Sequence, residues 1–127
     1  MRLLTFTLNH SEPLIGIRTN EKILNLKEAA KIAGEIGMAS NMKALLAAGP
    51  EGMARVRHLN SKALSDATTF QSAWLDKASI TYLPPIVDAD KFLCVGKNYR
   101  KHLEELQQTN LIKEIPQEPT GFIKLNS

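Results

Sequence analysis

The chain has a single cysteine, Cys94, among its 127 residues. One thiol excludes an internal disulfide framework and is typical of proteins that work in a reducing compartment. Because Cys94 lies in an apolar run, we expect a buried and inert thiol rather than a nucleophile. The sequence therefore predicts a cytoplasmic protein whose fold depends on its hydrophobic core.

Long apolar segments and dense charge are also scarce. No apolar run approaches the roughly 20 residues that a membrane span needs, and the run after Met1 is too short for the core of a signal peptide. Lys and Arg number 16 against 13 Asp and Glu, no basic run exceeds two residues, and aromatic residues make up only 6%. We therefore expect neither a membrane nor a nucleic acid as a partner.

Short alternating segments open the chain. Residues 2–8, 14–17 and 22–26 favour strands and are separated by polar turns, which predicts an antiparallel meander. His10 lies in the first turn, and His58 lies among arginines on an amphipathic segment. Neither histidine has a second ligand nearby in the sequence, so we expect surface side chains rather than metal ligands.

Helix signals follow the third strand. Asn25 and Glu28 have the spacing of a capping box, which predicts a helix that begins near Leu26. Apolar residues at helical spacing continue to Ile36, and Gly37 is typical of a helix end. We therefore expect Ile36 to lie on the inner face of this helix.

Further helices are expected before residue 80. The segment 41–48 predicts a short helix with Leu46 among its inward residues and Gly49 at its end. Pro50 suits the first turn of the next helix, and residues 61–75 predict another segment that is helical in its first half. Strands followed by helices indicate the α+β class.

The sequence predicts two domains. Residues 1–83 form the small α+β domain, with a strand meander followed by helices. Residues 84–90 contain Pro84-Pro85 and are predicted to be a semi-rigid linker. Residues 91–127 predict the first strand, helix and strand of a second domain, which is incomplete because few residues remain to bury a core.

A chemical motif is found only after this linker, where residues 91–105 read KFLCVGKNYRKHLEE. They predict a buried strand over 92–95, a tight turn at 96–98, and a helix with His102 and Glu105 on one face. The carboxylate can accept a hydrogen bond from one ring nitrogen and raise the basicity of the other, which makes a general base. The same spacing is common on solvated helices, so at this point both interpretations stay open.

The wider context resembles the fumarylacetoacetate hydrolase family. In that family a Val/Ile-Gly-x-Asn-Tyr turn precedes a His-x-x-Glu helix, and a Pro-x-x-Phe-x-Lys strand follows. The chain has these features in this order over 91–105 and in EPTGFIK at 118–124. The earlier meander, the Leu-Leu-Ala-Ala-Gly-Pro segment and the Leu-Pro-Pro segment are similar to the N-terminal domain that bacterial members carry.

The resemblance implies roles for five residues. His102 and Glu105 would be the catalytic general base. Lys124 would bind a substrate carboxylate or an oxyanion, although a solvated strand lysine is the alternative. Asn98 and Tyr99 match the turn that shapes the substrate's approach, and Tyr99 suits a packing role equally well.

The resemblance also implies a cofactor and a substrate class. A magnesium ion, or calcium in some members, would act as a Lewis acid on a small 2-oxo or 1,3-dioxo acid. The family's ligands, a Glu-x-Glu pair and an Asp, come after the Phe-x-Lys strand and are expected beyond Ser127. We assign no metal ligand in this chain, and Asp88 and Asp90 of the linker match none.

We therefore expect an N-terminal fragment, inactive alone, of a metal-dependent hydrolase, lyase or isomerase that is a homodimer at full length. The alternative is a non-catalytic accessory or oligomerisation module in which the helix with His102 and Glu105 is structural. In that case, apolar surface left without partner strands would make the chain associate.

Overall fold

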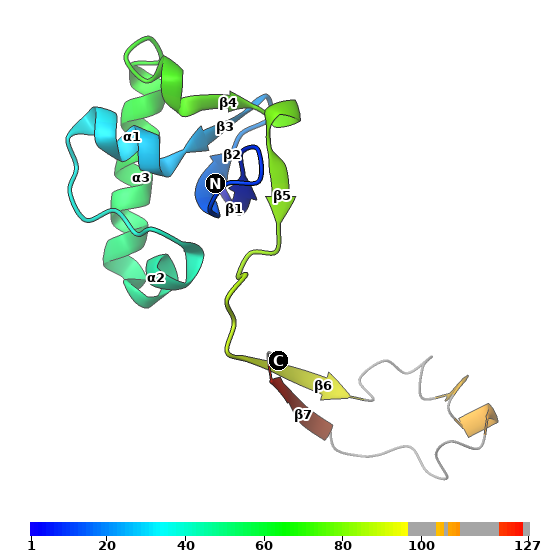
Figure 1. The fold of residues 1–127 in the computed structure, drawn as a ribbon. Helices are drawn as coiled ribbons and strands as arrows, with labels where there is room; N and C mark the ends of the chain where they lie inside the picture. The colour runs from blue at the N-terminus through cyan, green and yellow to red at the C-terminus, as the bar shows by residue number, and fades with distance from the viewer. Residues whose placement is uncertain (97–103, 106, 110–119, 126–127) are drawn as a thin grey trace. The chain divides into compact units, whose positions relative to one another are not determined.

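The chain divides into two compact units, Met1–Asp88 and Ala89–Ser127, and each is described by itself. The computed structural model describes residues 1–96, 104–105, 107–109 and 120–125. The expected α+β class is confirmed, because the first unit combines an antiparallel sheet with helices (Figure 1). That the units are separate domains joined by a linker over 84–90 stays a prediction.

The first unit begins with the expected meander. Its strands and helices are, in chain order, β1 (Arg2–Thr7), β2 (Leu14–Arg18), β3 (Lys22–Asn25), α1 (Leu26–Ala33), α2 (Met42–Ala47), α3 (Gly49–Ser65), the 3-10 turn η1 (Gln71–Ala73), β4 (Trp74–Asp76), the 3-10 turn η2 (Lys77–Ser79) and β5 (Thr81–Leu83). Strands β1, β2 and β3 pair antiparallel with their sequence neighbours. The meander predicted from alternation and turn residues is therefore confirmed.

The sheet is completed by two strands from the end of the unit. Its order is β4-β3-β2-β1-β5, so β4 and β5 occupy opposite edges. Only residues 77–80 separate these two edge strands in the sequence. A flat sheet would hold its edges about 19 Å apart, at about 4.8 Å for each neighbouring pair. Since a 3-10 turn shortens the connection, the sheet must curl to bring its edges together.

The two faces of this curled sheet are buried in different ways. On one face, α1 and α3 cover the larger core. Its most buried large side chains are Ile15, Ile17, Leu24, Leu26, Leu45, Val56 and Leu59. On the other face, Leu4, Phe6 and Ile23 form a second cluster. The partly buried side chains that pack against this cluster also come from strands and their adjoining loops. The curled sheet therefore buries this second cluster without a helix.

Helix α1 begins where the sequence predicts and ends earlier. The Asn25 side-chain oxygen accepts hydrogen bonds from the backbone N–H groups of Lys27 (3.1 Å) and Glu28 (3.3 Å), as an N-cap does. The helix ends at Gly34, which adopts a left-handed φ of 68°. Ile36 is 94% exposed, so its predicted place on the inner face is wrong. Gly34 and Gly37 are both suitable residues for the end of a helix, and α1 ends at Gly34, the first of the two.

The boundary between α2 and α3 also differs from the prediction. Leu46 was expected inside but is 53% exposed, because α2 is short and turns only Met42 and Leu45 inward. Gly49 opens α3 instead of closing α2, and Pro50 follows within the first turn, where its missing N–H costs nothing.

The predicted helical segment from Ser61 is part of α3 itself, which runs unbroken to Ser65. Strand β4, whose residues Trp74–Asp76 pair with β3, was not predicted from the sequence. Such short strands are specified by their sheet partner more than by local propensity.

The second unit contains a two-stranded antiparallel ribbon. Strand β6 (Lys91–Gly96) pairs with β7 (Thr120–Leu125), with Leu93 opposite Ile123. The strand predicted over 92–95 is present, but its predicted burial is wrong: Leu93 is 79% exposed and Val95 57% exposed. Cys94, expected to be buried, is half-buried. Two paired strands do not cover either of their own faces, and the described residues of this unit supply no further strand to pack on them.

Candidate functional site

Two of the five predicted site residues belong to the described part of the chain. Glu105 lies in a helical segment, and Lys124 lies on β7. His102, Asn98 and Tyr99 lie outside the described residues, so the predicted pair of His102 and Glu105 stays a prediction.

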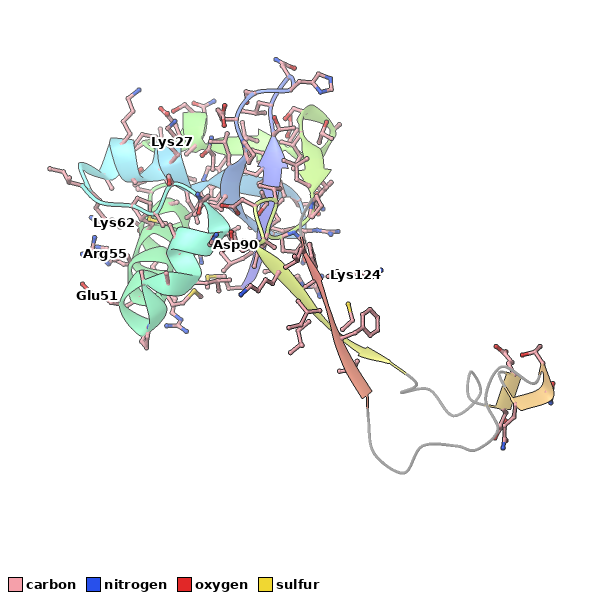
Figure 2. The ribbon with its side chains drawn as sticks, turned by 60° about the horizontal axis from the view of Figure 1, so that its bottom comes forward. Lys27, Glu51, Arg55, Lys62, Asp90 and Lys124 are labelled. Carbon is pink, nitrogen blue, oxygen red and sulfur yellow. The ribbon has the colours of Figure 1, made fainter. Side chains whose placement is uncertain are left out.

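Lys124 lies on one face of the β6–β7 ribbon. Directly opposed residues of an antiparallel pair share a face, and the register places Lys124 opposite Phe92 and Phe122 opposite Cys94. The Lys124 ammonium lies 5.9 Å from the centroid of the Phe122 ring, at the outer limit of a cation–π contact. Lys124 is labelled on β7 in Figure 2, and the residue is exposed. The face therefore offers one cation beside aromatic surface.

We name this surface the lysine face; it comprises Phe92, Cys94, Phe122 and Lys124. An exposed ammonium next to a ring can bind a carboxylate while the ring packs against an apolar part of the same ligand. The half-buried thiol of Cys94 is a further polar group on this face, and its contact with the carbonyl of Phe92 is long, at 4.0 Å.

The opposite face of the ribbon has a different character, and we name it the aliphatic face. Its large hydrophobic side chains are exposed by more than half, and they are Leu93 (79%), Val95 (57%), Ile123 (61%) and Leu125 (71%). Lys91, opposite Leu125 in the register, also lies on this face. Four aliphatic side chains thus lie exposed on one face of the described ribbon, and grouped apolar exposure of this kind is uncommon on monomeric proteins. Each face of the ribbon therefore carries one lysine, and the two faces differ in that one has aromatic rings and the other has aliphatic side chains.

Glu105 belongs to a short helical stretch in which residues 104–105 and 107–108 are helical. Its backbone carbonyl accepts hydrogen bonds from the N–H (3.1 Å) and the hydroxyl (3.0 Å) of Thr109, which ends the stretch. The residue is exposed. Helical structure at this position is what the His-x-x-Glu pattern requires if its two side chains are to face the same way.

His58, for which we expected no metal role, lies beside an acidic residue of the α1–α2 loop. Its Nε2 is 3.6 Å from a carboxylate oxygen of Glu35, and Lys62 lies 3.5 Å from the same oxygen. One turn away on α3, Arg55 donates to the carbonyls of Ile36 and Gly37. These contacts hold the α1–α2 loop against α3.

No metal centre is formed by the residues that the structure describes: in 1–96, 104–105, 107–109 and 120–125, no three His, Cys, Asp or Glu side chains are grouped closely enough to hold an ion. In the same ranges, no helix is both long and apolar enough to cross a lipid bilayer.

Phe122 and Phe92, the aromatic half of the lysine face, were given no role from the sequence. Phe122 and Lys124 are two residues apart, and this spacing on a strand is a readable signal that they share a face. The place of Phe92 opposite Lys124 depends on strand register, which the sequence alone does not give.

A scan against models of protein families finds no match for the chain, and a search of curated proteins finds none either. The resemblance of residues 91–127 to the fumarylacetoacetate hydrolase family therefore rests on its motifs and stays a prediction.

Proposed function

We propose that the chain is the N-terminal part of a metal-dependent hydrolase, lyase or isomerase of the fumarylacetoacetate hydrolase type, which acts on a small 2-oxo or 1,3-dioxo acid in the cytoplasm. In this proposal the enzyme is a homodimer at full length. The strongest support is the β6–β7 pairing, which joins the two strands that flank the His-x-x-Glu motif and holds Lys124 on the lysine face.

The order of structure around the motif adds support. Strand β6 precedes it, helical residues accompany Glu105, and β7 follows with Lys124. This order of strand, helix and strand is the one that the motif implies. The aromatic rings beside Lys124 would limit water around a bound carboxylate, which strengthens its attraction to the ammonium.

In the proposed mechanism the residues of this chain bind the substrate and move protons. Lys124 holds a carboxylate or a developing oxyanion, which costs no reorganisation if the ammonium is already in place. His102 takes a proton from the attacking water, and Glu105 orients the imidazole and stabilises its charged form. The metal, when bound, supplies Lewis acidity, but the described residues offer no set of ligands that fits it.

The test uses the protein translated through and beyond Ser127, assayed for loss of a 1,3-dioxo acid. We expect His102→Ala to lower kcat by a factor of about 10² to 10⁴, as removal of a general base does, with magnesium affinity unchanged. His10→Ala is the control, because His10 lies in the turn after β1. Equal turnover of the His102→Ala and wild-type proteins would contradict the assignment. So would a reading frame that continues without a Glu-x-Glu motif.

The aliphatic face favours a second candidate, an oligomerisation module that does no chemistry. Four exposed aliphatic side chains on one ribbon face would be removed from water if this face packed against a second protein surface, which favours association. Size measurement of this chain by analytical ultracentrifugation distinguishes the two candidates when it is combined with the assay. Reversible association together with no turnover by the longer protein would favour the module.

A further inference from the structure

The first unit carries a basic hollow that the proposed function does not use. It encloses about 260 Å³ at the start of β1 and the β2–β3 turn. Its lining residues are Met1, Arg2, Arg18, Thr19, Asn20 and Lys77. Three of the six are cationic, and none is acidic. We propose that this hollow binds a phosphate group carried by a small soluble ligand.

The central observation is a pair of arginines. Arg2 of β1 and Arg18 of β2 are directly opposite in the antiparallel register, so their side chains leave the same face of the sheet. Like charges in this position repel each other and destabilise a strand pair. Within the described ranges, no carboxylate forms an ion pair with either guanidinium. An anion bound between them would relieve the repulsion.

A third cation is fixed at the same hollow. Lys77 follows β4, and its ammonium donates a hydrogen bond to the backbone carbonyl of Asn20 in the β2–β3 turn. This contact uses one of the three donors of an ammonium. The remaining donors stay available for a ligand beside Arg2 and Arg18.

Of the neighbouring polar groups, the Thr19 side chain is already engaged. The Thr19 hydroxyl donates to the Lys22 carbonyl (2.7 Å) and accepts from the Lys22 N–H (2.9 Å), so it closes the turn. Asp76, the acidic residue next to Lys77 in the chain, lies opposite Lys22 in the β3–β4 register. The hollow therefore keeps its positive charge.

The chemistry of the lining identifies the ligand class. Arginine presents its N–H groups as a planar fork that matches the oxygens of phosphate, and two such forks with an ammonium suit a dianion better than a single carboxylate. The volume lies below the roughly 300–1,000 Å³ of pockets that enclose drug-sized ligands. A compact group such as a phosphate monoester fits both the charge and the size.

The inference does not depend on the proposed function, because every lining residue belongs to Met1–Asp88 and the proposed catalytic residues follow the division. The test titrates inorganic phosphate into the full chain by calorimetry, at constant ionic strength. We expect saturable binding that Arg18→Gln weakens about tenfold or more, the loss of one charge-assisted contact. Arg57→Gln on the exposed side of α3 is the control, and its affinity should equal that of the wild type.

Thermal unfolding guards against a variant that merely misfolds. Without phosphate, Arg18→Gln should melt at the wild-type temperature or higher, because the cross-strand repulsion is gone. With phosphate, the wild type should gain more in Tm than the variant. Equal phosphate affinity for wild type and Arg18→Gln would overturn the proposal, as would equally strong binding of acetate or chloride.

The source of the phosphate is tested by competition. Glycerol phosphate should displace inorganic phosphate from the chain, as expected for a small soluble ligand. Retention of the chain on vesicles that contain phosphatidic acid, combined with no displacement by glycerol phosphate, would instead identify a lipid headgroup and overturn the soluble ligand.

Discussion

Thr5 donates a hydrogen bond of 2.6 Å from its hydroxyl to the backbone carbonyl of Pro85. Thr5 lies in β1 and is only 3% exposed, and Pro85 is the second residue after β5. One buried side chain thus holds the first residues after the sheet against its first strand. Because Pro85 cannot donate a backbone hydrogen bond, its carbonyl is the group through which this segment is fixed.

We expect Thr5→Val to lower the free energy of unfolding by about 1–2 kcal/mol, since the shape is kept and the carbonyl loses its donor. Urea denaturation followed by circular dichroism measures the change. Thr81→Val in β5 is the matched control, because Thr81 is exposed and should change stability by less than about 0.5 kcal/mol. Equal effects of the two substitutions would show that the hydrogen bond contributes nothing.

The cap of α1 gives a second prediction. Asn25→Ala removes the acceptor for two backbone N–H groups and should cost about 1 kcal/mol, while Asn25→Asp keeps an acceptor and should cost less. Both free energies come from urea titrations. If alanine were tolerated as well as aspartate, the cap would not be what starts this helix.

Two glycines should respond to alanine for different reasons. A Cβ on Gly16 would lie 2.7 Å from the backbone oxygen of Leu24 and 3.0 Å from the Phe6 ring, so Gly16→Ala should cost about 2–3 kcal/mol. Gly34 has open space around it but a left-handed φ of 68°, so Gly34→Ala should cost only about 1 kcal/mol. Thermal and urea unfolding rank the two, and the reverse order would contradict the packing of β2 on β3.

Stability in acid should depend in part on Asp66. The pKa of its carboxyl is lowered by hydrogen bonds from the Thr69 hydroxyl and then from the Thr69 backbone N–H, the latter at 3.1 Å. A carboxyl with a lower pKa in the folded state stabilises the protein above its unfolded-state pKa, and this contribution is lost as the pH falls through the folded-state pKa.

The advantage of the wild type over Asp66→Asn should therefore shrink as the pH falls from about 6 to below about 4. Unfolding measured across this range for both proteins tests the prediction. Parallel stability curves over the whole range would contradict it.

The aliphatic face should control self-association. Leu93→Lys with Ile123→Lys places two charges on adjacent, directly opposed positions of the ribbon. The double variant should bind less of a hydrophobic dye and sediment as a smaller species than the wild type. Exchanging Lys27 and Lys31 on α1 for Gln is the control, since both are exposed and belong to the first unit. Unchanged dye binding by the ribbon variant would remove this face as an interaction surface.

Local signals explain which parts of the fold were predictable. The meander and the Asn25 cap depend on residues within a few positions of one another, so alternation and cap chemistry were sufficient. Strand β4 depends on pairing with β3 across about fifty intervening residues; such pairing is set by tertiary structure rather than by local propensity. The exposure of Leu93 was not predicted for a related reason. An apolar strand sequence indicates that its side chains favour burial, but it does not identify the element that would bury them.

The sequence predicted the kinds of residue in the candidate site but not how they are arranged in space. Motif order led to Glu105 and Lys124. The motif also contains Phe122, but the place of its ring beside Lys124 follows from side-chain alternation along the strand. The pairing of Arg2 with Arg18 could not be predicted, because the two residues become neighbours only through the register of β1 and β2.

The pairing of β1 with β5 has a consequence for synthesis. Thr5 meets Leu83 in this pair, so β1 can gain its second neighbour only after Leu83 has left the ribosome. Until then β1 remains an edge whose backbone groups can pair with another nascent chain. Closing this long segment also carries more loop entropy than the hairpins that precede it. The last strand of the unit is therefore the step at which folding and aggregation compete.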